Sequence, residues 1–87
     1  MGQNNINRSI MTIHVYAGLK DYFLPEFELT EEVGNIDQLR DCLLAINNQS
    51  AKLLAACRFA VQEGFIDSTY KFKAHEIVIV VPPSSGG

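Results

Sequence analysis

Hydrophobic and polar residues alternate from Met11 onward, which predicts a β-strand at the start of the folded region. Ile13 and Val15 would share one face of this strand, and the other face would carry Thr12, His14 and Tyr16. A second alternation, around Phe27 and Leu29, predicts a second strand. The two strands would form a hairpin-like pair, with a helical turn somewhere between residues 19 and 24.

Residues 36–46 have the spacing of an amphipathic helix. One face repeats at intervals of three and four and carries Ile36, Leu39, Leu43 and Ile46. Asn35 is suited to cap its N-terminus, and Gln38 stands at the third helical position of a capping box. We expect the helix to end at Asn47-Asn48.

The second half of the chain predicts three further strands. After a loop, residues 53–62 hold a strand centred on Cys57–Val61, Glu63-Gly64 forms a turn, and Phe65-Ile66 pairs back briefly. The last strand covers residues 76–81, where Ile77 to Val81 are all apolar. Such a run is typical of a central strand that is buried on both faces or that has one face awaiting a partner.

With a single substantial helix, only one face of the sheet can be covered, and alternate residues of the last strand would stay exposed unless something docks there. The order β, β, α, β, short β, β matches an α+β β-grasp with a mixed sheet of four to five strands and one main helix. Residues 11–81 would form this domain, residues 1–10 a disordered extension, and residues 82–87 a flexible tail.

Composition narrows the function classes. The chain is 47% hydrophobic and 20% charged, as expected for a globular domain. A net charge of −3, with Lys and Arg scattered singly, disfavours nucleic-acid binding. Cys42 and Cys57 lie in apolar surroundings without a C-x-x-C spacing, which favours two buried, reduced thiols, a cytoplasmic protein and no metal site.

The last six residues, Pro82-Pro83-Ser84-Ser85-Gly86-Gly87, indicate an arm rather than a packed element. Proline cannot donate to a sheet ladder, and two prolines favour an extended exit. Glycine allows another protein to enclose the backbone closely. An α-carboxylate, with a pKa of about 3.5, is a poor electrophile until it is activated, for instance as an acyl-adenylate. Taken alone, the pair Gly86-Gly87 could equally be an inert end.

From about Met11 onward the chain resembles the small, sulfur-carrying subunit of molybdopterin synthase, in the ubiquitin-like MoaD/ThiS superfamily. The resembling segments are residues 13–21, Lys52-Leu53-Leu54-Ala55-Ala56, Ala60-Val61-Gln62, Glu76-Ile77-Val78 and the Pro-Pro-x-x-Gly-Gly ending. Two positions depart from the family pattern: Lys73-Ala74-His75 replaces a Gly-Asp or similar turn, and Ser84 stands where valine is common.

The resemblance implies a function and a set of partners. The first and last strands would pair in parallel. An ATP-using, E1-like adenylyltransferase would adenylate Gly87, and a sulfurtransferase would convert it to a thiocarboxylate. The tail would then enter the large, catalytic subunit and deliver sulfur to a pterin precursor. The chain would be a co-substrate without a permanently bound cofactor, and it would dock through an apolar surface at Tyr16, Phe65 and Val81.

Other interpretations stay open. Sulfur could go to thiazole or another acceptor, the carboxylate could be conjugated to protein lysines, or the chain could be a β-grasp interaction module whose glycines are inert. Tyr16 and Phe65 could be core residues. His14 and His75 fit surface positions better than catalytic ones. The acidic residues Glu26, Glu28, Glu31 and Glu32 could be a solvated face or could steer a basic patch on a partner.

Overall fold

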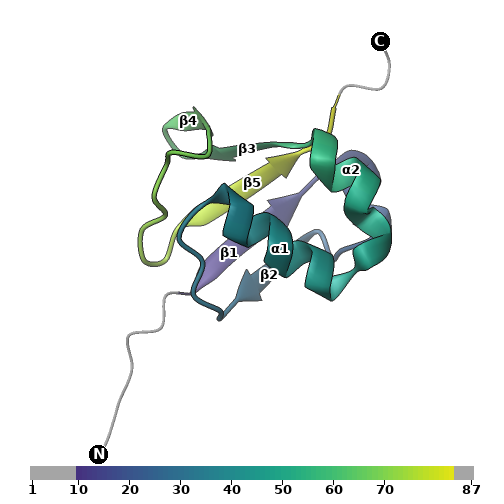
Figure 1. Ribbon diagram of the computed structural model, residues 1–87, viewed down its shortest axis with the longest axis horizontal. Coiled ribbons are helices and arrows are strands. Elements are labelled where there is room, and N and C mark those ends of the chain that lie inside the picture. Colours follow the sequence, from purple (N-terminus) through teal and green to yellow (C-terminus); the bar gives the residue numbers. More distant parts are fainter. Residues whose placement is uncertain (1–9, 84–87) are drawn as a thin grey trace, which may run out of the picture.

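The computed structural model describes residues 10–83 and contains one five-stranded sheet (Figure 1). The strands are β1 (Met11–Val15), β2 (Glu26–Leu29), β3 (Arg58–Val61), β4 (Gly64–Ile66) and β5 (Ile77–Val81). Their order across the sheet is β2-β1-β5-β3-β4, so β2 and β4 form its two edges.

The first and last strands lie side by side in the centre of the sheet. β1 pairs with β5 in parallel, from Thr12 opposite Ile77 to Val15 opposite Val80. The pairs β1–β2, β3–β5 and β3–β4 are antiparallel. This topology, with helical segments on one face, is the β-grasp arrangement that the sequence predicted.

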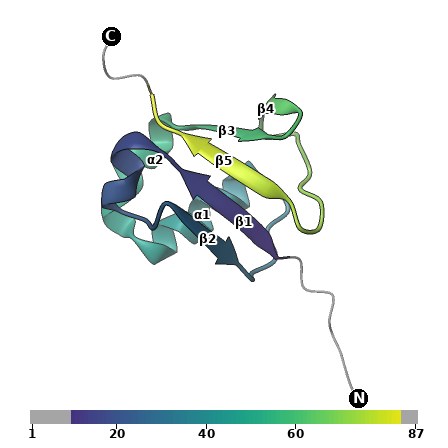
Figure 2. The ribbon, with the colours of Figure 1, turned by 180° about the vertical axis from the view of Figure 1, so that it is seen from behind.

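Helices α1 (Ile36–Ile46) and α2 (Ala51–Ala56) lie on one side of the sheet, with the short 3₁₀ turn η2 (Asn48–Ser50) between them in the chain. A second 3₁₀ turn, η1 (Ala17–Asp21), follows β1 at the end of the sheet. Figure 1 views the sheet through α1 and α2, and Figure 2 shows the opposite face, which no helix covers. No helix within residues 10–83 is long and apolar enough to cross a membrane.

The core therefore lies between the helical layer and one face of the sheet. Alternate strand residues, among them Ile13, Val78 and Val80, are fully buried there. From α1, Ile36, Leu39 and Leu43 pack onto them as the periodicity predicted. Ile46 was expected on the same face, but it is 51% exposed and lines a surface groove instead.

The segment before β3 differs from the prediction. Residues 48–50 form η2 and residues 51–56 form α2, where the sequence pattern predicted a loop and the start of a strand. The run Lys52-Leu53-Leu54-Ala55-Ala56 consists of strong helix formers. Leu54 anchors α2 in the core. The expectation of one main helix still holds, since α2 has only six residues.

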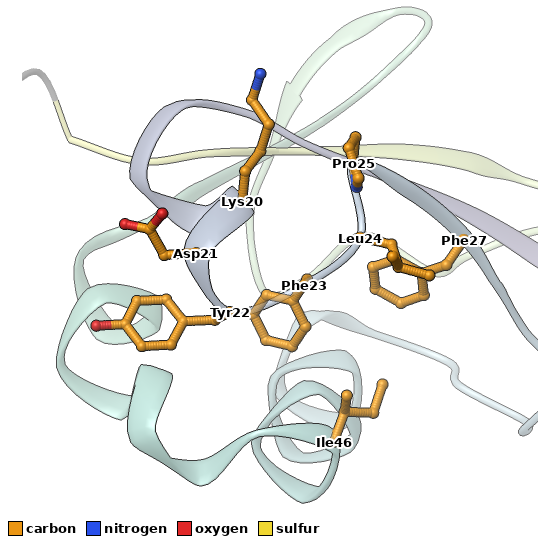
Figure 3. Close-up of a pocket in the computed structure, with 8 residues that line it drawn as sticks. All are labelled: Lys20, Asp21, Tyr22, Phe23, Leu24, Pro25, Phe27 and Ile46. Carbon is orange, nitrogen blue, oxygen red and sulfur yellow. The ribbon is translucent and has the colours of Figure 1, made fainter.

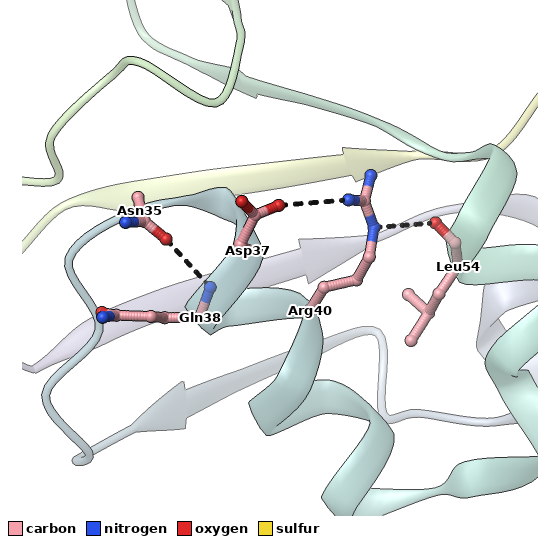
Figure 4. A network of polar contacts seen from close by, with 5 residues as sticks. All are labelled: Asn35, Asp37, Gln38, Arg40 and Leu54. Atoms are coloured by element: carbon pink, nitrogen blue, oxygen red, sulfur yellow. Dashed lines mark hydrogen bonds and ion pairs between the residues drawn. The ribbon is translucent and has the colours of Figure 1, made fainter.

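Arg40 joins three elements at this point, and Figure 4 shows its contact with Leu54. Its Nε donates a hydrogen bond of 3.3 Å to the carbonyl oxygen of Leu54 near the end of α2. Its guanidinium lies 5.1 Å from the ring centroid of Phe59 on β3. Arg40 thus positions α2 and the start of β3 relative to α1.

An asparagine lies at each end of α1: the Asn35 side chain caps the N-terminus, and the backbone N–H of Asn47 bonds the Leu43 carbonyl oxygen at the C-terminus. Asn35 Oδ1 accepts a hydrogen bond of 3.0 Å from the backbone N–H of Gln38, as predicted (Figure 4). The Gln38 side chain accepts from the N–H of Gly34 at 2.6 Å, one residue earlier than in the usual capping box. Asn47 closes α1 and caps η2 by accepting from the N–H of Gln49 at 3.0 Å.

Candidate functional site

The place where the chain leaves the sheet is the centre of the candidate site. β5 lies between β1 and β3 and ends at Val81, opposite Arg58. Val81 and Pro82 are half-buried and Pro83 is exposed. Because proline offers no backbone N–H, the ladder ends here. Ser84, Ser85, Gly86 and Gly87 lie outside the described residues, as do residues 1–9, so the predicted tail and extension are not tested.

The uncovered face of the sheet, which we call the outer face, is apolar along β5. Ile77, Ile79 and Val81 point to it, while Val78 and Val80 point into the core. Ile77 is 55% exposed, whereas Ile79 and Val81 are half-buried by their neighbours in the sheet. The register adds Thr12 and His14 from β1, and Arg58 and Ala60 from β3. The predicted exposure of alternate β5 residues is confirmed for Ile77 and is only partial for Ile79 and Val81.

Phe65 lies on this face and is 56% exposed, so it is not a core residue. It stands opposite Ala60 on β3, which in turn stands opposite Ile79 on β5. The guanidinium of Arg58 lies 3.8 Å from the Phe65 ring centroid, within the range of a cation–π contact. This edge of the outer face therefore combines an aromatic ring with a positive charge.

Tyr16 lies at the opposite side of the exit point. It follows Val15, whose partner is Val80, so it stands at the end of the sheet where Val81 leads into Pro82. Its side chain is 49% exposed. With two strands between β1 and β4, Tyr16 and Phe65 are separated by about 14 Å across the strands. The two aromatic residues flank Val81 rather than contact each other.

Beyond β1, the outer face becomes acidic. His14 Nε2 lies 3.9 Å from a carboxylate oxygen of Glu26, its cross-strand partner. Glu26, Glu28, Glu31 and Glu32 are all exposed, which agrees with a solvated position for this predicted acidic group. The face thus runs from positive at Arg58, through apolar β5, to negative at β2.

Groups able to perform chemistry are dispersed. His14 is on β1, and His75 is exposed in the turn before β5. Within residues 10–83 no three His, Cys, Asp or Glu side chains come together as a metal site. This part of the chain therefore offers a surface and an exit point, not a cluster of catalytic groups.

The two thiols are free, and their positions make them weak nucleophiles. Burial raises the pKa of Cys57, against a smaller opposing effect of Arg40, and its Sγ donates to the carbonyl oxygen of Leu53 at 3.1 Å. Burial raises the pKa of Cys42, and the adjacent Glu31 carboxylate raises it further. Cys57 is buried as predicted, but Cys42 is only half-buried because it lies on the side of α1 near Glu31.

The sequence pointed to Tyr16, Phe65 and Val81 but not to Arg58. Arg58 precedes Ala60 by two residues, so both lie on one face, and the short turn at Glu63-Gly64 brings Phe65 opposite Ala60. The spacing across this predicted hairpin was the available signal. What the sequence did not specify is the rotamer that lays the guanidinium on the ring.

No protein-family model matches the chain, and no curated protein sequence matches it significantly. Among solved structures, the chain is similar to a putative molybdopterin converting factor, subunit 1, from Pyrococcus furiosus, with a TM-score of 0.76 and 15% identity over 87% of this chain and 99% of that one.

Two further structures show the same likeness. In a complex of subunits 1 and 2 of molybdopterin-converting factor from Helicobacter pylori, the matching chain has a TM-score of 0.65 and 19% identity over 90% of this chain and 99% of that one. Small archaeal modifier protein 1 from H. volcanii has a TM-score of 0.73 and 9% identity over 87% of this chain and 99% of that one. At these identities the likeness establishes the fold.

Proposed function

We propose that this chain is a ubiquitin-like sulfur carrier that acts as the small subunit of a molybdopterin synthase. The observation that carries the proposal is the position of β5: the central strand passes directly into Pro82-Pro83 beside an uncovered apolar face. A partner bound to this face would lie next to the residues that follow Pro83 and could accept them in its active site. The similar chain from Helicobacter pylori, which is part of a complex of subunits 1 and 2, supports a large partner subunit for this one.

In the proposed reaction, a carboxylate oxygen of Gly87 attacks the α-phosphorus of ATP in the active site of an E1-like enzyme, and pyrophosphate leaves. The outer sulfur of a persulfide on a sulfurtransferase then attacks the acyl carbon, the acyl C–O bond breaks, and AMP leaves, which gives an acyl disulfide. A thiol reductant cleaves this disulfide, so that the thiocarboxylate is released and the donor and reductant thiols end as a disulfide. In the large subunit, the thiocarboxylate sulfur attacks a carbon of a pterin precursor and displaces an oxygen leaving group, and water then hydrolyses the acyl–sulfur bond, which leaves the sulfur on the pterin and regenerates the Gly87 carboxylate.

The described residues would contribute binding rather than bond-making. Tyr16, Val81 and Phe65 give the partner apolar contact around the exit point, and Arg58 offers a charge for a carboxylate on the partner. Pro82 and Pro83 reduce the number of conformations of the arm, which lowers the entropic cost of inserting it.

The direct test is intact-mass analysis of the full chain after incubation with an activating enzyme, ATP and a sulfur source. We expect a mass gain equal to replacement of one oxygen by sulfur, located in the C-terminal peptide. Deletion of Gly87 should abolish the gain. An unchanged mass, under conditions that charge a known carrier, would refute the proposal.

A second test separates the carrier from a β-grasp interaction module with inert glycines. Val81→Asp places a charge on the outer face and should abolish the protein's function in the cell whether it is a carrier or a module, because both need the partner to bind there. Deletion of Gly87 should abolish that function only if the chain is a carrier. If function in the cell is retained after the deletion, the module is favoured.

The similarity to a small archaeal modifier favours one alternative, in which the activated carboxylate is conjugated to a protein lysine. This alternative predicts conjugates of higher mass that are retained under denaturing, reducing conditions. The synthase proposal instead predicts stable co-purification with a large subunit.

A further inference from the structure

The edge of the sheet at β2 has unpaired backbone groups. Val15 N–H donates to the carbonyl oxygen of Pro25 at 3.0 Å. This bond shows which residues of β2 direct their backbone groups toward β1, because only every second pair in an antiparallel ladder is hydrogen-bonded. Phe27 and Leu29 then exchange hydrogen bonds with β1, while the N–H and C=O groups of Glu26 and Glu28 point away from it. Within residues 10–83 nothing lies beyond β2 in the sheet, so these four groups are open to an added strand.

A groove of about 490 Å³ lies next to this edge (Figure 3). Its lining residues come from the segment between β1 and β2, from β2 and from α1, and include Phe23, Leu24, Phe27 and Ile46. The rings of Phe23 and Phe27 stack with centroids 5.9 Å apart. Leu24 is 69% exposed and Ile46 is 51% exposed, so the groove presents aliphatic side chains to solvent.

The two sides of β2 differ in chemistry. Phe27 and Leu29 point to the helical side, where the groove lies, and Glu26 and Glu28 point to the outer face. A strand added beside β2 would send alternate side chains to these two sides. Apolar residues of that strand would enter the groove, and the intervening residues would stand beside the two carboxylates. Exposed Glu31 and Glu32, just after β2, extend the negative charge.

We propose that the β2 edge and its groove form a second docking site, which binds an extended segment of a partner protein in which aliphatic residues alternate with Lys or Arg. The backbone of the segment would pair with Glu26 and Glu28, its aliphatic side chains would fill the groove, and its basic side chains would pair with the carboxylates. β1 separates this site from β5 and the exit point.

A second copy of this chain fits the edge poorly. Pairing of two β2 strands would place Glu26 and Glu28 of one copy beside the same residues of the other, and like charges on neighbouring strands destabilise the pair. The acidic edge therefore selects against self-association and in favour of a basic partner.

The test uses the full chain, labelled for NMR, and a soluble peptide of alternating valine and lysine about eight residues long, which is an ordinary strand length. We expect saturable shifts of backbone amides in Glu26–Leu29 and in the groove residues. A peptide of the same composition, with its valines and lysines in two separate blocks, should bind at least about tenfold more weakly.

Variants separate the backbone pairing from the charge. Glu28→Pro removes an outward N–H that β1 does not use, and it should weaken binding about tenfold. Glu28→Gln keeps that N–H and should weaken binding about threefold. Glu63→Gln, at the exposed β3–β4 turn, is the matched control and should bind as the original chain does. If Glu28→Pro does not fold, Ile46→Asp provides a second test within the groove.

Three results would overturn the proposal: equal binding of the alternating and block peptides, shifts centred on Ile77–Val81, or a dimer formed through β2. Unchanged affinity of both Glu28→Pro and Ile46→Asp would do so as well. The site is independent of the carrier chemistry, so deletion of Gly86 and Gly87 should leave peptide binding unchanged even though it abolishes charging with sulfur.

Discussion

His75 adopts a backbone conformation that glycine would adopt more easily. Its φ is +60°, in the left-handed region, two residues before β5 begins. The turn is held by Glu76, whose carboxylate accepts hydrogen bonds from the N–H of Lys73 at 2.8 Å and from the Tyr70 hydroxyl at 3.0 Å. This is the turn in which Lys73-Ala74-His75 replaces the Gly-Asp or similar turn of the family that the sequence resembles, and here a histidine adopts the left-handed conformation.

This conformation predicts an ordered set of stabilities at position 75. His75→Gly should raise the free energy of unfolding by up to about 1 kcal/mol, since it relieves the strain of a side chain at positive φ. His75→Val should lower it by about 1 to 2 kcal/mol, because branching at Cβ makes this region less accessible still. Urea denaturation followed by circular dichroism measures both.

Ala74→Gly is the control for the glycine substitution. Ala74 does not have a positive φ, so glycine there only adds freedom to the unfolded chain and should cost about 0.5 to 1 kcal/mol. Equal stability of the glycine and valine variants at position 75 would contradict the assigned turn conformation.

The helical elements depend on tertiary contacts to different degrees. α1 has eleven residues, an apolar face and a capping side chain, which are all local features. α2 has only six residues, too few for a stable isolated helix in water. Its stability depends on burial of Leu54 and on the hydrogen bond from Arg40 to the Leu54 carbonyl. The shorter element was therefore the one that the periodicity failed to identify.

Removal of the α1 cap should have a measurable cost. Asn35→Ala removes the oxygen that accepts from the N–H of Gln38, and it should lower the free energy of unfolding by about 1 kcal/mol. Asn35→Asp keeps an acceptor there and adds a negative charge at the helix N-terminus, so it should keep the original stability. Thermal unfolding of the three proteins distinguishes them, and an unaffected alanine variant would show that the cap is energetically neutral.

Across the molecule, the sheet has one covered and one uncovered face. Covering only one face leaves the central strand with two classes of apolar residue: Val78 is fully buried, and neighbouring Ile77 is 55% exposed. Protein-binding surfaces are commonly apolar at the centre and charged at the border, as this uncovered face is. The groove beside β2 is a separate surface, for which we propose a different partner: an extended segment of alternating aliphatic and basic residues.

Two substitutions in β5 compare how much the buried and the exposed side chains of this strand contribute to stability. Val78→Ala should lower the free energy of unfolding by about 2 kcal/mol, the transfer energy of two methyl groups plus a cavity. Ile77→Ala removes more carbon atoms, yet it should cost less than about 1 kcal/mol because the side chain is already half in water. Chemical denaturation checks the order, and a larger loss for Ile77→Ala would mean that the outer face is covered.

Residue spacings alone were enough to predict the succession of strands along the chain, the α1 boundaries and cap, and the alternation that leaves Ile77 and Val81 off the core. These features follow from intervals of two to four residues, which act within one element. The sequence also singled out Tyr16, Phe65 and Val81, which the structure places around the exit of β5; their docking role remains a prediction.

Other features depend on contacts between segments that are distant in the sequence. These features are the formation of α2, the exposure of Ile46, the stacking of Arg58 on Phe65 and the open edge beside Glu26 and Glu28. Each of these depends on which parts of the chain become neighbours, and local periodicity carries no information about that.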